Sequence, residues 1–121
     1  MATSTIKALN TVGSVINITD QDTTYFSKLA FRKIGRVVYF MSRAIKTNAT
    51  ISTTSGITLG TVPDNIKPID TVIIPMYNRN SATFGELMID TDGIVTFTKR
   101  SGTFEENTYS TVTGYCYISA S

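Results

Sequence analysis

Short runs in which apolar and polar residues alternate make up most of the chain, and their period of two is typical of β-strands. The first clear run covers residues 29–34, where odd-numbered and even-numbered side chains predict the two faces of a half-buried strand. Gly35 interrupts the pattern, and residues 36–46 form the longest predicted strand. Both faces of its first half are apolar, so we expect it to be covered on two sides, by the core and by a partner chain.

All three prolines fall within residues 56–77, where they delimit two further strands. A β run over residues 57–62 stops at Pro63, because proline has no N–H to donate to a sheet. Pro63-Asp64-Asn65 is a turn signal, since proline presets φ and Asp and Asn side chains bond their own backbone. Pro68 stiffens the return, and residues 71–74 predict a strongly apolar strand.

The next two predicted strands, residues 84–90 and 94–99, are joined by Thr91-Asp92-Gly93. A two-residue loop would place Leu87 and Ile89 opposite threonines. A three-residue loop with Gly93 in the left-handed conformation pairs them with apolar residues instead, Leu87 with Phe97 and Ile89 with Val95. Because a slip of one residue turns a whole face of a strand over, the three-residue loop is the predicted one.

Polar loops are predicted over residues 47–55, 78–81 and 100–107, and residues 109–119 close the chain as a last strand. One face of that strand carries Val112, Cys116 and Ile118, and the other carries Thr113, Tyr115 and Tyr117. No helical stripe of useful length occurs. Short strands with turn signals about every 8 to 12 residues are typical of an antiparallel β-sandwich or barrel, so the chain is predicted to be all-β.

The first 24 residues differ from the rest, because they are rich in Thr, Asn and Asp and contain no aromatic side chain. One short strand is allowed there by Val12, Val15, Ile16 and Ile18. We therefore predict an arm or linker over residues 1–24 and one β domain over residues 25–121, since the length suits a single core.

Charge and composition limit the kinds of partner and the location that can be expected for the protein. The net charge of +2 is too small to indicate a nucleic-acid or membrane partner. Residues 1–10 lack the apolar core of a signal peptide, and no segment approaches the roughly 18 apolar residues of a membrane span, so a soluble protein is expected. The single cysteine, Cys116, is expected to be a buried, unreactive thiol.

Catalytic chemistry has little support in the sequence. The chain has no histidine, the commonest general base and neutral metal ligand. Most carboxylates fall in predicted turns or loops, where solvated Asp and Glu are ordinary. Asp90-Thr91-Asp92-Gly93 superficially resembles the start of a calcium loop but lacks the later oxygen ligands. We predict that the protein is not an enzyme and needs no cofactor or metal.

The aromatic residues say more about possible binding than the carboxylates do. Four phenylalanines fit core positions: Phe31, Phe40, Phe84 and Phe97. Four tyrosines are predicted at strand ends or on less apolar faces: Tyr77, Tyr109, Tyr115 and Tyr117. Two interpretations of these tyrosines stay open, packing at a sheet surface or interface and contact with a ligand. A sugar ring has an apolar face and a rim of hydroxyls, which Tyr, Asn, Asp and Arg on loops can meet.

Several segments together resemble a known kind of domain: residues 31–38, 59–68, 72–75 and 86–95, followed by the Tyr-rich last strand. The most specific piece is Leu-Gly-x-Val-Pro-x-x-Ile-Lys-Pro over residues 59–68, followed by the Asp-Gly hairpin. The chain resembles the C-terminal head domain of receptor-binding proteins from the baseplates of siphophages that infect Gram-positive bacteria, such as the lactococcal phages. The resemblance covers about residues 29 to 119.

The resemblance implies a β-sandwich head in the virion, at the phage tail tip or baseplate, that binds saccharide of the host cell wall without catalysis. It also implies a homotrimer, and contacts with other baseplate or tail proteins through a region N-terminal to residue 1, of which residues 1–24 would be a neck remnant. This chain departs from many members because it has neither Trp nor His, so stacking on sugar would fall to Tyr or Phe.

Two loops hold the densest mixture of aromatic and planar polar groups, and they supply the candidate saccharide-binding residues: Tyr77, Asn78, Arg79, Asn80, Glu105, Asn107 and Tyr109. The candidate trimer-interface residues are Val37, Tyr39, Tyr115 and Tyr117. Two alternatives remain. The same fold serves as a structural baseplate or tail-fibre domain that binds protein and no sugar, or, least favoured, the chain is a depolymerase.

Overall fold

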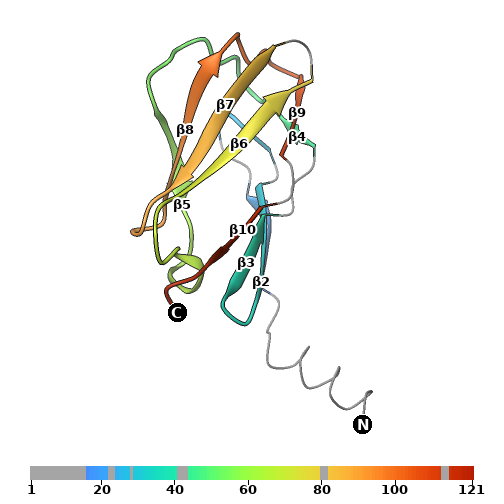
Figure 1. Ribbon diagram of the computed structural model, residues 1–121. Helices are drawn as coiled ribbons and strands as arrows, with labels where there is room; N and C mark the ends of the chain where they lie inside the picture. Colours follow the sequence, from blue (N-terminus) through green and yellow to red (C-terminus); the bar gives the residue numbers. More distant parts are fainter. Residues whose placement is uncertain (1–15, 22–23, 28, 41–43, 80–81, 113–114) are drawn as a thin grey trace.

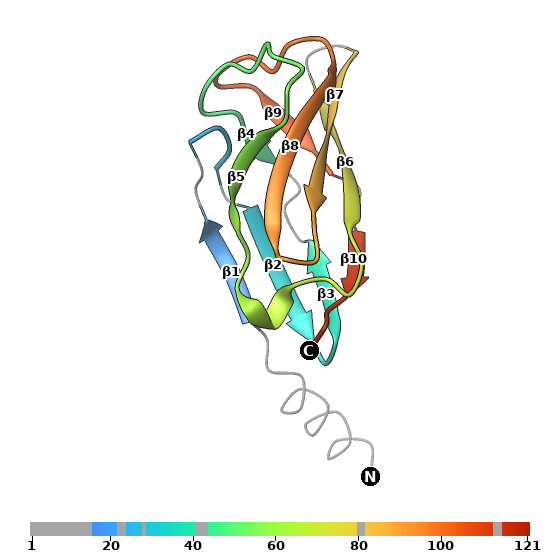
Figure 2. The same ribbon diagram turned by 90° about the vertical axis from the view of Figure 1, so that its left-hand side faces the viewer.

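The computed structural model of the chain describes residues 16–21, 24–27, 29–40, 44–79, 82–112 and 115–121. Within them, two antiparallel sheets stack as a β-sandwich (Figures 1 and 2). The prediction of an all-β antiparallel fold is confirmed. Among the described residues the only helical turn is η1, a 3-10 helix at Asp64–Ile66, where Pro63 and its neighbours predict a turn.

One sheet has four strands and the other has six. The four-stranded sheet runs in the order β1 (Ile16–Gln21), β2 (Leu29–Ile34), β3 (Val37–Phe40) and β10 (Tyr115–Ile118). The six-stranded sheet runs in the order β4 (Ile45–Lys46), β9 (Tyr109–Thr111), β6 (Val72–Asn78), β7 (Thr83–Ile89), β8 (Ile94–Ser101) and β5 (Ile57–Thr61). Strands β2, β5, β6, β7 and β8 lie where the alternation of the sequence predicts strands.

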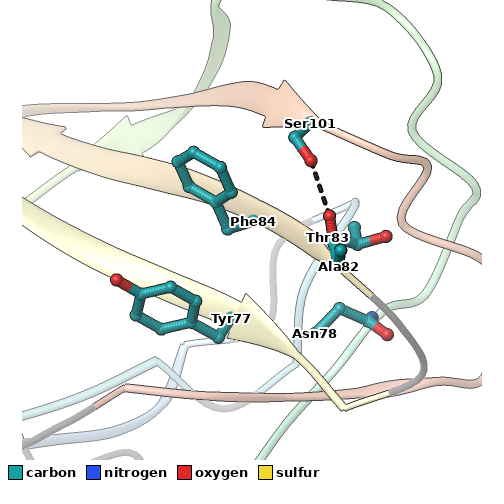
Figure 3. Close-up of a pocket in the computed structure, with 6 residues that line it drawn as sticks. All are labelled: Tyr77, Asn78, Ala82, Thr83, Phe84 and Ser101. Atoms are coloured by element: carbon teal, nitrogen blue, oxygen red, sulfur yellow. Dashed lines mark hydrogen bonds between the residues drawn. The ribbon is translucent and has the colours of Figure 1, made fainter.

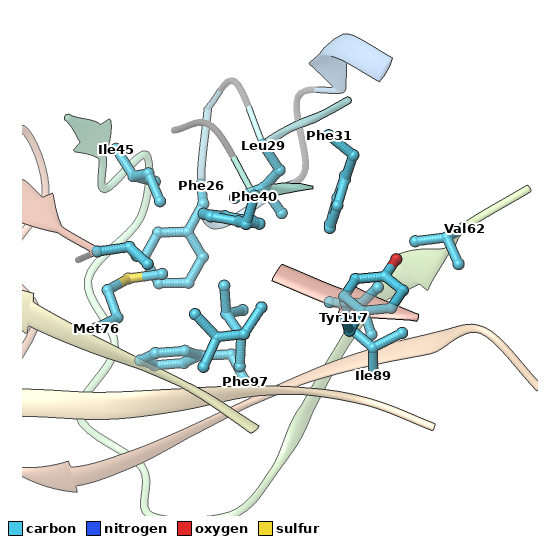
Figure 4. Packing of buried hydrophobic residues seen from close by; sticks show 14 of the residues in the cluster. Phe26, Leu29, Phe31, Phe40, Ile45, Val62, Met76, Ile89, Phe97 and Tyr117 are labelled. Atoms are coloured by element: carbon cyan, nitrogen blue, oxygen red, sulfur yellow. The ribbon is translucent and has the colours of Figure 1, made fainter. Parts of the chain in front are cut away.

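Side chains from both sheets meet in one core (Figure 4). Phe26, which precedes β2, packs edge-to-face on Phe97 of β8, with 4.8 Å between the ring centroids. Phe104 completes the cluster, 5.0 Å from Phe97 and 6.2 Å from Phe26. The ring of Phe97 lies over Gly85 of the neighbouring β7, where any side chain would collide with it. These aromatic pairs add about 0.5–1.5 kcal/mol each beyond the apolar area that they bury.

The turn between β7 and β8 has the predicted register. Leu87 pairs with Phe97 and Ile89 with Val95, and Gly93 has a φ of +83°. The carboxylate oxygen Oδ1 of Asp90 accepts hydrogen bonds from the backbone N–H groups of Asp92 (3.0 Å) and Ile94 (2.9 Å). The predicted three-residue loop is confirmed.

Two predicted strands, residues 36–46 and 109–119, each divide between the sheets. The first becomes β3 in one sheet and β4 in the other, and the second becomes β9 and β10. Because β3 pairs with β10 and β4 pairs with β9, the two segments form one antiparallel ribbon that passes from sheet to sheet. The prediction of a continuous strand is wrong in both places. Phe40 and Ile45 are both buried, although a continuous strand would place them on opposite faces.

The change of sheet also reverses the predicted faces of β10. Tyr117 is buried in the core, whereas Cys116 and Ile118 are exposed. The expected burial of Cys116 and the outward placement of Tyr117 are therefore wrong. Val112 and Tyr117 are both buried, so the period of two does not continue from β9 into β10.

The segment around η1 closes the lower end of the sandwich in Figure 1. The Lys33 ammonium donates to the carbonyl oxygens of Asn65 (2.6 Å) and Ser121 (2.8 Å), which allows a largely buried lysine on the inner face of β2. The Tyr117 hydroxyl donates to the carbonyl of Ile66 (2.7 Å). Strands β2 and β10 thus hold η1 and the last residues against the four-stranded sheet.

Strand β1 lies within the predicted arm of residues 1–24, yet it pairs with β2, so that part of the predicted arm is a strand of the sheet. Residues 1–15 lie outside the described residues. The division of the chain at residue 25 stays a prediction.

Replacing Gly93 with valine should destabilise the fold. A β-branched residue would be forced into a left-handed conformation, and its Cβ would lie 3.0 Å from Val62 Cγ2. The backbone strain alone costs on the order of 1 to 3 kcal/mol. Thermal and urea unfolding of Gly93→Val measure the loss. Thr91→Val changes an exposed residue of the same turn, so it should unfold at the same temperature and urea concentration as wild type. If Gly93→Val were as stable as wild type, the left-handed conformation of Gly93 would be contradicted.

Tyr117 should make stability fall at alkaline pH. Burial raises the pKa of its hydroxyl above the ordinary value of 10.0. Above pH 10.0 the unfolded chain loses this proton while the folded chain keeps it, so the free energy of unfolding falls as pH rises. Below that pH this group adds no pH dependence.

Urea unfolding from about pH 8 to about pH 11 tests this linkage. Tyr117→Phe should lose about 1–3 kcal/mol at the lower pH, because the Ile66 carbonyl loses its donor, and should then depend less steeply on pH than wild type. Tyr39→Phe, which removes a tyrosine hydroxyl from an exposed position on the same sheet, is the matched control and should be as stable as wild type at the lower pH. Identical slopes for wild type and Tyr117→Phe would show that Tyr117 does not contribute.

Candidate functional site

The end of β6 and the start of β7 lie at the upper end of the six-stranded sheet in Figure 1 and carry two exposed aromatic residues, Tyr77 and Phe84. Tyr77 pairs with Phe84 across the two strands. Their ring centroids are 6.0 Å apart and the ring planes are inclined by 31°, and Tyr77 is 53% exposed. The two rings therefore present a shallow apolar platform to solvent.

A cavity of about 330 Å³ lies at this platform (Figure 3). It will be called the Tyr77 pocket. Its lining consists of Tyr77, Asn78, Ala82, Thr83, Phe84 and Ser101. The Ser101 hydroxyl donates to the carbonyl of Ala82 (2.6 Å), which ties the end of β8 to the start of β7. The pocket thus combines two ring faces with a polar edge.

Arg79 lies next to the platform in a defined orientation. Its Nε–H donates to the Thr111 hydroxyl of β9 (3.0 Å), and Thr111 is the cross-strand neighbour of Tyr77. Thr111 uses only the Nε–H, so the two amino groups of the guanidinium remain as donors. The backbone N–H of Arg79 donates to the carbonyl of Tyr109 (3.0 Å). Tyr109 and Thr111 flank the buried Ser110, so both lie on the outer face with Tyr77.

The structure thus brings three of the predicted site residues together, Tyr77, Arg79 and Tyr109. It does so because β9 pairs with β6 antiparallel, which places the start of β9 beside the end of β6. Both loops lie at one end of the sheet, as the sequence predicts.

Asn78 has a different place in the fold from the predicted one, while its role as a saccharide contact stays a prediction. It is the last residue of β6 rather than a loop residue, and it is only 6% exposed. Its side-chain amide donates to the Thr108 hydroxyl (2.8 Å), and Thr108 in turn donates to the carbonyl of Glu105 (2.6 Å). Asn78 therefore forms the polar floor of the site and ties β6 to the loop before β9.

Glu105 and Asn107 lie in a tight turn before β9, and both are exposed. Asn107 has a φ of +65°, a conformation that Asn tolerates better than most residues, and its backbone N–H donates to the carbonyl of Thr47 (2.8 Å). Backbone groups of this turn make its hydrogen bonds, and one of them, the carbonyl of Glu105, accepts from the Thr108 hydroxyl and so fixes the position of Thr108. Asn80 lies outside the described residues.

Phe84, Ser101 and Thr111 belong to the site, although the sequence does not single them out for it. Phe84 is 38% exposed on the outer face, where it was expected in the core. A signal for this was present, because Phe84 alternates with the buried Gly85 and Leu87 and shares its face with Glu86. Cross-strand partners such as Ser101 and Thr111 have no comparable signal in the sequence.

The predicted interface residues fall on two faces of the four-stranded sheet. Tyr39 is exposed and Val37 is half-buried on the outer face. Tyr115 packs against the core, and Tyr117 is part of it. The expectation of outward tyrosines on β10 is therefore wrong, since both side chains serve the packing of the sandwich.

Two arginines, Arg79 and Arg100, are exposed on the six-stranded sheet near the site. Arg100 of β8 pairs with Glu86 of β7 at 2.6 Å on the outer face. In the part of the chain that the structure describes, no carboxylate forms an ion pair with Arg79.

Across the described residues no three His, Cys, Asp or Glu side chains are grouped so as to hold a metal ion. Nor does a helix among them have the length and hydropathy of a membrane span.

Comparison with models of known protein families finds no family that matches this chain, and no curated protein matches it significantly.

Asn78→Ala should reduce stability. The change removes a buried amide and leaves the half-buried Thr108 hydroxyl without its donor, so we expect the free energy of unfolding to fall by about 1–3 kcal/mol. Arg79→Ala, one residue further along and exposed, should change it by less than about 0.5 kcal/mol. Urea unfolding of the two variants measures both values. Equal stability of Asn78→Ala and wild type would contradict a structural role for Asn78.

Proposed function

We propose that this chain is a phage receptor-binding head domain that attaches to saccharide on the host cell surface, without catalysis. The observation that carries the proposal is the exposed pair Tyr77 and Phe84 with an oriented guanidinium, Arg79, beside it. Aromatic faces cover the apolar face of a sugar ring, and a guanidinium donates to ring hydroxyls or to an acidic substituent. The size of the Tyr77 pocket is at the lower end of the range for small-molecule sites.

The position of the site supports an attachment role. Phe84 lies at one end of β7, and the turn that contains Gly93 follows the other end. The Gly93 carbonyl accepts a hydrogen bond from Val62, just before η1, and η1 is held by Lys33. Strand β1 begins opposite Lys33. The chain therefore enters its first described strand at the end of the sandwich far from the Tyr77 pocket, as suits a head whose N-terminal side joins other tail proteins.

A homotrimer in the virion, at the tail tip or baseplate, belongs to the same proposal. Val37 and Tyr39 are its candidate contact residues, because they lie on the outer face of the four-stranded sheet, where Tyr39 is 38% exposed. A structural baseplate or tail-fibre domain that binds protein alone is the alternative. It is the conclusion to draw if the chain assembles but binds no cell-wall saccharide.

Binding to host cell-wall fragments tests the saccharide site directly. Tyr77→Ala and Arg79→Ala should each weaken binding about tenfold, which corresponds to roughly 1.4 kcal/mol, because each removes one half of the sugar contact. Tyr109→Ala should weaken it less, since Tyr109 borders the platform without lining the pocket. Isothermal titration with the wall fragments measures the affinities.

Arg32→Ala is the matched control for Arg79→Ala, because Arg32 is an exposed arginine on the other sheet. It should bind like wild type. All variants are compared at equal assembly state and with unchanged melting. If Tyr77→Ala and Arg79→Ala both bind with wild-type affinity, the Tyr77 pocket is not the saccharide site.

A further inference from the structure

A row of paired residues crosses the upper end of the six-stranded sheet from β9 to β8. Thr111 of β9 pairs with Tyr77 of β6, and Tyr77 pairs with Phe84 of β7. Phe84 in turn pairs with Ser101 of β8. Neighbouring strands lie about 4.8 Å apart, so the row spans about 14 Å. It is therefore much longer than the 6.0 Å between the centroids of the two rings at its centre.

The two rings at the centre of the row lie beside each other on neighbouring strands (Figure 3). Their planes are inclined by 31°, and Tyr77 is 53% and Phe84 38% exposed. An aromatic ring covers the apolar face of one sugar ring. The platform therefore has room for two consecutive sugar units, one over each aromatic ring.

A guanidinium lies on each side of the platform. On the β9 side, the Nε–H of Arg79 donates to the Thr111 hydroxyl (3.0 Å). On the β8 side, the Nε–H of Arg100 donates to the Glu86 carboxylate (2.6 Å). Glu86 follows Phe84 by two residues on the same face of β7, so it holds the Arg100 guanidinium on the Phe84 side of the platform.

Both guanidiniums keep donors for a ligand, because these contacts use the Nε–H and leave the two amino groups. The pair of Arg100 with Glu86 is exposed, with side chains that are 54% and 29% exposed, and pairs of this kind add little to stability. The pair does hold Arg100 in one orientation, which lowers the entropy lost when the guanidinium meets a ligand.

A ligand that ran down the strands instead would meet aliphatic side chains. Below the platform, Ile73 and Met88 pair across β6 and β7, and both are exposed. They offer no hydrogen bond to a sugar hydroxyl, and a hydroxyl that leaves water without a new hydrogen bond costs free energy. Across the strands, Arg79 and Arg100 supply those hydrogen bonds at the two sides of the platform. The direction across the strands is therefore favoured.

We infer that the Tyr77 pocket is part of an extended site that takes an oligosaccharide lying across β6, β7 and β8. One sugar unit covers Tyr77 and the next covers Phe84, with Arg79 bonding the first and Arg100 the second. Arg100 is thus a further specificity-determining residue. The ligand class is a stretch of glycan chain rather than a single sugar. This inference rests on the proposed function and adds the length and direction of the ligand.

Isothermal titration of the full chain with size-fractionated fragments of the host wall polysaccharide tests the extended site. Wild type should bind a tetrasaccharide at least about tenfold more tightly than a monosaccharide. Arg79→Ala and Arg100→Ala should each weaken tetrasaccharide binding about tenfold, because each removes a charged donor. A monosaccharide cannot reach both guanidiniums, so its affinity should fall in at most one of these variants.

Arg32→Ala is again the matched control, since it removes an exposed arginine from the other sheet and should bind every fragment like wild type. Arg100 is exposed, so Arg100→Ala should keep the wild-type melting temperature.

The outcomes separate the extended site from the function on which it rests. Equal affinity of wild type for monosaccharide and tetrasaccharide would overturn the extended site and leave the proposed function standing. So would wild-type affinity of Arg100→Ala for the tetrasaccharide, or a monosaccharide whose binding both arginine variants weaken. If no fragment binds at all, the proposed function itself is overturned, and the extended site with it.

Discussion

The antiparallel ribbon that passes between the sheets is the constraint on which the rest of the molecule depends. Its two halves pair as β3 with β10 in one sheet and as β4 with β9 in the other, so neither sheet can shift relative to the other without breaking backbone hydrogen bonds. The ribbon places Tyr117 in the core and leaves Ile118 on the surface. It also presents Thr111 to Arg79. The ribbon thus supplies Tyr117 to the core and places β9 beside β6 at the candidate site.

The β7–β8 hairpin could be predicted in detail because the information that determines it is local. Turn length, the need for a left-handed glycine and the requirement to pair apolar residues all lie within a short segment, and they agree on one register. The ribbon could not be predicted in the same way. The alternation of apolar and polar residues indicates which side of a strand is buried. It does not indicate where a segment passes from one sheet to the other. Residues 36–46 and 109–119 therefore looked continuous.

The candidate site was predictable to the extent that loops at one end of antiparallel strands meet. Tyr77, Arg79 and Tyr109 converge for that reason. The role of Asn78 could not be predicted in this way, because an asparagine suits a sugar contact as well as it suits a structural hydrogen bond to Thr108. Only the pairing of β6 with β9 decides between these roles. Phe84 was misplaced since a phenylalanine in an apolar strand suggests the core, although its own alternation with Gly85 placed it outside.

The contact between Phe97 of β8 and Gly85 of β7 limits which residues of β7 can be exchanged. The inner face of β7 at this point is a bare backbone filled by a ring from β8, so residue 85 tolerates no side chain. Phe84, directly before it, lies on the outer face of the strand, where it is 38% exposed and its ring lies beside that of Tyr77. The proposed contact residue Phe84 and the residue that the core requires, Gly85, are thus neighbours on opposite faces of one strand. Exchange of Phe84 can therefore alter the proposed saccharide-binding surface while the core stays intact, which would allow a domain of the proposed function to follow a change of ligand.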